Sequence, residues 1–116
     1  MVAEADGEVV GFAELITAPD EPRHRHVGEI NMVAIHADWG RQGIGRRLTE
    51  ELVDLADSWL NLARLGLIVF TDNAHAIRLY EDRGFKVEGT MLRFGFGAGE
   101  WMDAHVMGRL HDPSSR

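Results

Sequence analysis

The 116-residue chain contains no cysteine. This absence excludes a disulfide framework, a thiolate metal site and a cysteine nucleophile. No hydrophobic run approaches the roughly 18 residues that a membrane span needs. The first ten residues, MVAEADGEVV, also lack the basic start and the apolar stretch of a secretory signal. We therefore expect a cytoplasmic protein with no membrane partner, long enough to bury one core without disulfides or metal.

Basic residues are also few: lysine and arginine count 12 against 19 aspartate and glutamate residues, so the formal net charge is −7. A general nucleic-acid binder needs a basic face, and we expect no nucleic-acid partner. The six histidines show no metal-ligand spacing, and we expect no metal. The sequence has no repeats, low-complexity tracts or linkers. Residues 1–116 are therefore predicted to form one domain.

Hydrophobic patterning predicts eight elements, in the order strand, strand, strand, helix, strand, helix, strand, strand. Asp6-Gly7 is typical of a hairpin turn between the first two strands. The strand–helix–strand part implies a parallel pair with a right-handed crossover, and the other pairs should be antiparallel. The fold class is therefore α+β with a mixed sheet. The predicted strands cover 1–5, 8–16, 27–36, 65–70, 85–94 and 100–110, and the predicted helices cover 44–60 and 73–83.

The first predicted helix has one apolar stripe, which we expect to be buried. Its members are Leu48, Leu52, Leu55, Ala56 and Trp59. Asp72 or Asn73 can cap the second helix, because a short side-chain oxygen accepts a hydrogen bond from the first turn. Gly84 follows the second helix at the place where a left-handed C-cap is expected.

The segment 33–48 has the most informative pattern: a strand runs into glycines, and a helix begins within the turn. Glycines let backbone N–H groups converge on one point. A helix N-terminus adds free donors and a positive dipole end, so such a turn suits a phosphate or pyrophosphate. Arg41, Arg46 and Arg47 concentrate positive charge here in an otherwise acidic chain. Alternatively, the glycines only make a tight connection and the arginines are solvated; spacing alone leaves both interpretations open.

The turn matches neither the dinucleotide fingerprint nor the P-loop. It resembles instead the acetyl-CoA motif of the GCN5-related N-acetyltransferases (GNAT), Q/R-x-x-G-x-G/A, which Gly40-Arg41-Gln42-Gly43-Ile44-Gly45 occupies. Gly40 stands where the family usually has Gln or Arg. A second segment, 73–85, is similar to the family's N-x-x-A-x-x-L-Y-x-x-x-G-F. Residues 88–107 resemble the bacterial subgroup that acetylates small amines and L-amino acids, and the whole resemblance covers about 8–110.

The resemblance implies an acetyl-CoA-binding core at about 27–85. The backbone of Val33, Ala34 and Ile35 should pair with the pantetheine arm like an added strand. The pyrophosphate should be held by five consecutive backbone N–H groups, those of Gln42, Gly43, Ile44, Gly45 and Arg46. The side chain of Arg41 is expected to reach a phosphate. Asn73 should contact the cofactor near the start of its helix, and Tyr80 should lie by the thioester sulfur.

Direct acetyl transfer to an amine needs a neutral amine, an N–H donor for the oxyanion and a proton for the leaving thiolate. Tyr80, the only tyrosine, suits the third task because a phenol stays protonated at neutral pH. Glu29 is the candidate base, acting directly or through water, and a backbone N–H near Val33 is the candidate oxyanion donor. The alternatives are that Tyr80 only fills the core and that Glu29 is an exposed strand residue.

These residues predict an acetyl-CoA-dependent N-acetyltransferase that acts on a small-molecule amine or amino acid in a ternary complex. The alternative is a degenerate, non-catalytic CoA-binding module. The resemblance also implies that the family's first strand and two helices have no counterpart in the chain, which is N-terminally shortened relative to the family. That would leave the first strand as an unpaired edge, uncover sheet surface and remove one wall of the acceptor site. We therefore expect a homodimer.

Overall fold

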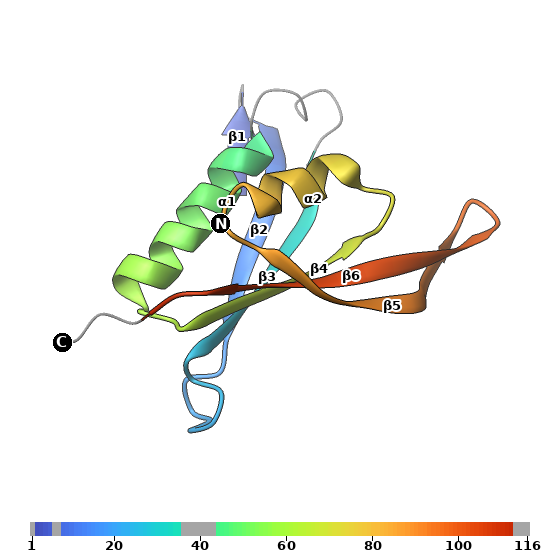
Figure 1. Cartoon of the computed structure of the whole chain (residues 1–116). Helices are drawn as coiled ribbons and strands as arrows, with labels where there is room; N and C mark the ends of the chain where they lie inside the picture. Colours follow the sequence, from blue (N-terminus) through green and yellow to red (C-terminus); the bar gives the residue numbers. More distant parts are fainter. Residues whose placement is uncertain (1, 6–7, 36–43, 113–116) are drawn as a thin grey trace.

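The computed structural model describes residues 2–5, 8–35 and 44–112, with side chains for 13–31 and 46–112. The order of elements is the predicted one (Figure 1). The strands are β1 (Val2–Ala5), β2 (Glu8–Thr17), β3 (Val27–Ile35), β4 (Arg64–Phe70), β5 (Lys86–Gly97) and β6 (Glu100–Leu110). The helices are α1 (Ile44–Asp54), continued by a π-helical segment (Leu55–Trp59), and α2 (Ala74–Glu81).

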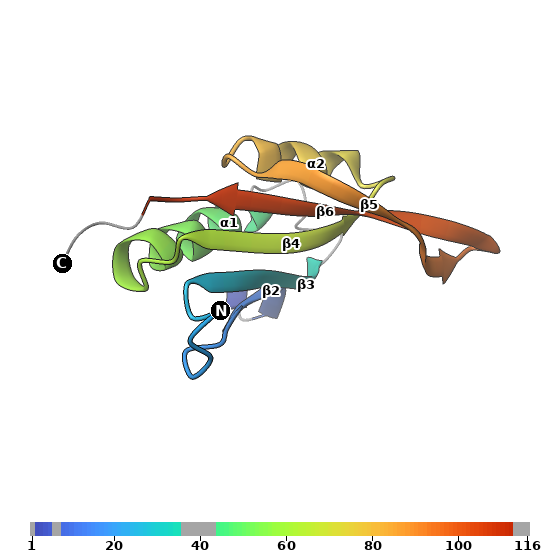
Figure 2. The same ribbon diagram turned by 60° about the horizontal axis from the view of Figure 1, so that its bottom comes forward.

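All six strands form one sheet in the order β1-β2-β3-β4-β6-β5. β3 and β4 are parallel, and every other neighbouring pair is antiparallel. The predicted α+β class with a mixed sheet is therefore confirmed. β6 inserts between β4 and β5, so the last hairpin folds back into the sheet (Figure 2). β1 lies at one edge, where it pairs with β2 alone among the described strands.

The parallel ladder between β3 and β4 is short. It contains three residue pairs and ends where Glu29 faces Gly66. Beyond this point β3 continues to Ile35 and β4 to Phe70, with no further ladder between them in the described residues. The two strands therefore open a gap inside the sheet while β3 stays paired with β2 on its other side.

Both helices pack on one face of the sheet. Their apolar residues join the alternate, buried residues of β4 in a single core that also holds Phe85. The members from the helices and β4 are Leu48, Leu52, Ala56, Leu79, Tyr80, Leu65, Leu67 and Val69. On the opposite face of β4, Ile68 and Phe70 are 53% and 37% exposed. In the described part of the chain, no helix is long and apolar enough to cross a membrane.

The first helix departs from its predicted form at its end. Leu48, Leu52 and Ala56 are buried as expected, but Trp59 is 74% exposed, so its predicted place on the buried stripe is wrong. The cause is the change to π-helical geometry after Asp54, where the N–H of Leu60 bonds the carbonyl of Leu55 at 3.0 Å. Each π-turn holds more residues than an α-turn, which rotates the following side chains away from the core.

The residues predicted to cap the start and follow the end of the second helix are confirmed. Asn73, rather than Asp72, is the N-cap: its side chain accepts a hydrogen bond from the N–H of Ala76 at 3.2 Å. Gly84 has a φ of 91°, in the region that glycine tolerates best. The helix itself ends at Glu81, two residues before the predicted end.

One ion pair ties the π-helical segment to the last strand. Arg109 donates from both terminal nitrogens to the Asp57 carboxylate, at 2.9 and 2.8 Å. Its Nε also donates to the carbonyl of Arg83 at 3.0 Å. The two side chains are only 17% and 21% exposed, so neither charge is fully solvated.

Replacing Asp57 with asparagine should lower the free energy of unfolding by about 2 kcal/mol, because it leaves the Arg109 guanidinium partly buried without its counterion. Urea denaturation of the purified variant measures this loss. The matched control is Asp54→Asn, one turn earlier, where the exposed carboxylate accepts one hydrogen bond from Ser58 at 3.3 Å. Equal midpoints for the two variants would show that the ion pair contributes nothing.

Candidate functional site

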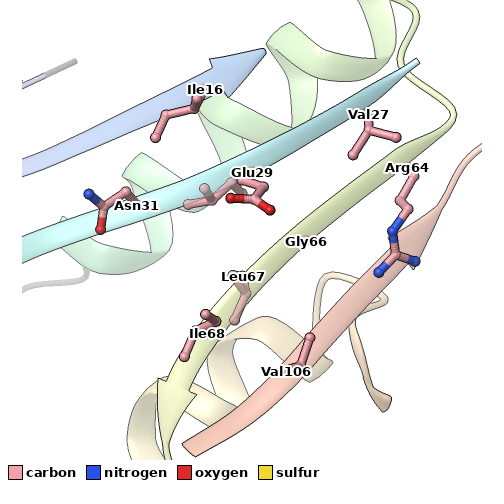
Figure 3. Close-up of a pocket in the computed structure, with 10 residues that line it drawn as sticks. Ile16, Val27, Glu29, Asn31, Arg64, Gly66, Leu67, Ile68 and Val106 are labelled. Carbon is pink, nitrogen blue, oxygen red and sulfur yellow. The ribbon is translucent and has the colours of Figure 1, made fainter. Parts of the chain in front are cut away.

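A cavity of about 320 Å³ lies at the point where β3 and β4 separate. Figure 3 shows β3 and β4 on its two sides, with β2 beyond β3 and β6 beyond β4. Most of its wall is apolar, and three residues, Glu29, Asn31 and Arg64, add polar groups. The lining residues are Ile16, Val27, Glu29, Ile30, Asn31, Arg64, Gly66, Leu67, Ile68 and Val106.

Glu29, the predicted base, lies in the wall of this cavity. It is exposed on β3, and its neighbours in register are Ile16 on β2 and Gly66 on β4. Because Gly66 has no side chain, the Glu29 carboxylate faces open space over β4 (Figure 3). The sheet thus brings a carboxylate to the last paired position before the strands diverge.

Two further polar groups line the cavity, and neither was predicted from the sequence. The amide of Asn31 donates to the carboxylate of Glu14 at 3.0 Å. Arg64 donates to Glu88 on β5, which raises the pKa of Arg64, and the nearby charge of Glu29 adds to this effect. The only signal for Arg64 in the sequence is its place directly before the apolar run LGLIVF.

Tyr80, the predicted acid, is in the core and not in the cavity wall. It projects from α2, is 6% exposed, and packs edge-to-face against Phe85 at 5.8 Å between ring centroids. Burial raises the pKa of its phenol above the usual value, because a phenolate is poorly solvated there. Leu67 and Ile30 belong both to the cavity wall and to the core that contains Tyr80. Burial therefore keeps the Tyr80 hydroxyl neutral, and the core that contains Tyr80 also supplies part of the cavity wall.

The predicted cofactor residues divide into two groups. Val33, Ala34 and Ile35 lie on the part of β3 that has left β4, so their backbone edge on that side is not used by the ladder. An open strand edge can accept an extended ligand by main-chain hydrogen bonds. Ile44 begins α1, followed by Gly45. Arg41, Gln42 and Gly43 lie outside the described residues.

Two predicted cofactor contacts have protein partners in the structure. The guanidinium of Arg46 lies 3.8 Å from the Asp82 carboxylate, with both side chains more than half exposed. The side-chain oxygen of Asn73 caps α2, so this residue has a structural role whether or not it also contacts a ligand. Among the described residues, no group of three or more histidine, aspartate and glutamate side chains is placed to hold a metal ion.

This fold, with its parted parallel strands, matches a known class. The model of the acetyltransferase (GNAT) family matches residues 1–85, and the chain belongs to that family. It is 36% identical over 110 residues to the L-amino acid N-acetyltransferase AaaT of Escherichia coli, covering 95% of the chain and 67% of that protein. It is 33% identical over 103 residues to the spermidine N(1)-acetyltransferase of the same species, covering 89% and 53%.

Solved acetyltransferase structures have the same fold. An acetyltransferase of the GNAT family from Streptococcus pneumoniae superposes with a TM-score of 0.84 at 31% identity, covering 94% of this chain and 64% of that one. The acetyltransferase yncA of Salmonella typhimurium, solved with acetyl-CoA, has a TM-score of 0.82 at 27% identity, covering 99% and 65%. The chain thus spans between about half and two thirds of the length of these relatives.

Proposed function

We propose that the protein is an acetyl-CoA-dependent N-acetyltransferase that transfers an acetyl group to the amine of a small molecule or amino acid. The observation that carries the proposal is the parting of β3 and β4, which leaves one open strand edge beside a cavity that Glu29 lines. The edge suits the pantetheine arm, and the cavity suits the acceptor. Relatives that act on amino acids and on spermidine support the reaction class.

In this proposal the open edge of Val33, Ala34 and Ile35 binds the pantetheine arm by main-chain hydrogen bonds. The pyrophosphate is bound by five consecutive backbone N–H groups, those of Gln42, Gly43, Ile44, Gly45 and Arg46. The side chain of Arg41 reaches a phosphate. Asn73 contacts acetyl-CoA near the start of α2. Residues 27–85 then form the acetyl-CoA-binding core of a single domain, 1–116.

Glu29 takes the proton of the acceptor ammonium, directly or through water, because only the neutral amine has a lone pair to attack the thioester. A backbone N–H near Val33 stabilises the oxyanion that forms. Tyr80, kept neutral by burial, gives its proton to the leaving thiolate. The C–N bond forms first, and collapse of the oxyanion then breaks the C–S bond. The nitrogen loses its second proton as the amide forms, and this proton restores Tyr80, so the two protons of the ammonium are finally carried by Glu29 and the CoA thiol.

A homodimer in the cytoplasm, without nucleic acid or a metal cofactor, completes the proposal. The homodimer is supported by the hairpin of β5 and β6, which projects beyond the helices (Figure 1). Three of its large apolar side chains, Leu92, Phe96 and Trp101, are more than 60% exposed. A second copy that covered them would remove this apolar area from water.

Saturating acetyl-CoA should raise the melting temperature of the purified chain, because the substrate binds only the folded state. At one hundred times the dissociation constant the gain is about 2.7 kcal/mol, or about 10 °C. Thermal denaturation with and without acetyl-CoA measures the shift. Pantetheine, which lacks the pyrophosphate, should raise the melting temperature less. The absence of any shift would contradict the proposal. A shift without CoA release in the presence of amines would identify a non-catalytic module instead.

A further inference from the structure

An ion pair between Arg64 and Glu88, called the fork below, lies at the end of the cavity next to Glu29. Arg64, the first residue of β4, donates from Nη1 to Oε2 of Glu88 at 2.9 Å and from Nη2 to the other carboxylate oxygen. This two-point arrangement is the geometry with which arginine binds any carboxylate. The two side chains are 32% and 38% exposed, so a solute can reach them.

Two facing glycines form the floor under this fork. Gly66 on β4 and Gly108 on β6 are partners in register. A Cβ at Gly108 would lie 2.5 Å from the Glu88 carboxylate, so the ion pair needs glycine there. A Cβ at Gly66 would be in ordinary contact with the carbonyl oxygen of Met107 at 3.8 Å and with Nη2 of Arg64 at 4.0 Å, so the Arg64 guanidinium lies beside this glycine. The cavity that Arg64, Gly66 and Glu29 line leaves room for a small molecule beside the fork.

Arg64 and Glu29 project on either side of Gly66 into the same cavity (Figure 3). They are diagonal neighbours on one face of the parallel pair, because Glu29 faces Gly66 and Arg64 faces Val27. Such neighbours are close enough for two long side chains to contact one small molecule. The positive charge of Arg64 and the negative charge of Glu29 are therefore complementary to a ligand that carries a carboxylate and an ammonium group on adjacent carbons.

We propose that Arg64 binds the α-carboxylate of an amino-acid acceptor, which takes the place of the Glu88 carboxylate in the fork. This inference rests on the proposed acetyl transfer, in which Glu29 faces the acceptor amine. Exchange of one carboxylate for another preserves both the charge and the hydrogen-bond geometry at Arg64. Glu88 is then an internal stand-in for the substrate, and Arg64 is a specificity-determining residue that selects amino acids over simple amines.

The protonation states agree with this exchange. The hydrogen bonds from Arg64 hold the pKa of Glu88 below its usual value, so Glu88 is a full anion at neutral pH. An amino-acid carboxylate is an anion under the same conditions. A polyamine would instead bring only positive charge to Arg64, and like charges disfavour that complex.

The test compares L-leucine, L-methionine and L-phenylalanine with their α-amides, and with spermidine, as acceptors. The wild type should prefer the acids over the amides. Arg64→Gln should raise the KM of the acids about tenfold or more, while the KM of the amides stays within about twofold. Glu88→Gln should lower the KM of the acids, because it frees Arg64 from its competitor.

The opposite directions of the two variants separate recognition from a structural role. An ion pair that only stabilises the fold would make Arg64→Gln and Glu88→Gln act alike, on acids and amides together, and this result would overturn the inference. A wild type that prefers spermidine or the amides over every acid would also overturn it. Isothermal titration of the acids and amides in the presence of CoA gives the same comparison without turnover. Loss of transfer to all amines would contradict the proposed function, while the titration would still decide the role of Arg64.

Discussion

Replacing Tyr80 with phenylalanine should lower kcat about 100-fold or more, the usual effect of removing a general acid. The variant keeps the ring that packs against Phe85 and loses only the hydroxyl. The KM for acetyl-CoA should change little, because the proposed binding groups are on β3, in the turn that leads into α1, and at Asn73, and the substitution changes none of them. Thiol release from acetyl-CoA with a saturating amine measures both parameters.

The pH profile adds a second test of Tyr80. Burial raises its pKa above the usual 10.0, so the phenol keeps its proton across the working range. The wild-type rate should rise as the acceptor amine loses its proton and should fall only above pH 10. The same raised pKa means that the stability contributed by neutral Tyr80 is complete below pH 10 and is lost as the pH passes the folded-state value. Full activity of Tyr80→Phe at every pH would remove the residue from the mechanism.

Replacing Glu29 with glutamine should lower kcat/KM about 100-fold at neutral pH, because glutamine has nearly the same shape but cannot accept the ammonium proton. The loss should shrink as the pH approaches the pKa of the acceptor amine, since an amine that is already neutral needs no base. Steady-state kinetics with one amine between pH 6 and about 10 measures this trend.

Glu14→Gln is the matched control for Glu29. Glu14 is a carboxylate on the adjacent strand, bonded to Asn31 at the cavity edge. The substitution makes the same chemical change without touching the proposed base, and kcat/KM should stay within about twofold of the wild type. Equal losses in the two variants would show that Glu29 acts only through the general negative charge of this face.

The sequence predicted the fold wherever a local signal was strong. Asn73 and Gly84 bracket α2 because a cap and a left-handed turn each depend on a few adjacent residues. The pair of β5 and β6 was also predicted, but β5 runs to Gly97 instead of ending at about residue 94. Ala98 and Gly99, both with positive φ, form the turn. The motifs predicted the family, and the match of the family model to residues 1–85 confirms it.

Features that depend on distant residues were not predicted. The π-helical segment that exposes Trp59 contains Asp57, and the ion pair of Asp57 with Arg109 joins residues 52 positions apart. The Arg64–Glu88 fork needs β6 between β4 and β5, and Gly108 under Glu88. Neither the strand order nor this contact follows from local periodicity. Asn31 and Arg64 could therefore be recognised as cavity residues only from the three-dimensional arrangement.

The central claim is direct transfer of the acetyl group from acetyl-CoA to an amine bound in the cavity between β3 and β4. A single-turnover experiment with excess protein, acetyl-labelled acetyl-CoA and a panel of amino acids and amines tests it most directly. Mass spectrometry follows the label on the protein and on the amine over time. We predict that the label passes to an acceptor amine with equimolar CoA release and no acetylated protein, and that Glu29→Gln slows this step. Acetyl-CoA that stays intact with every amine, or label that accumulates on the protein first, would contradict the account.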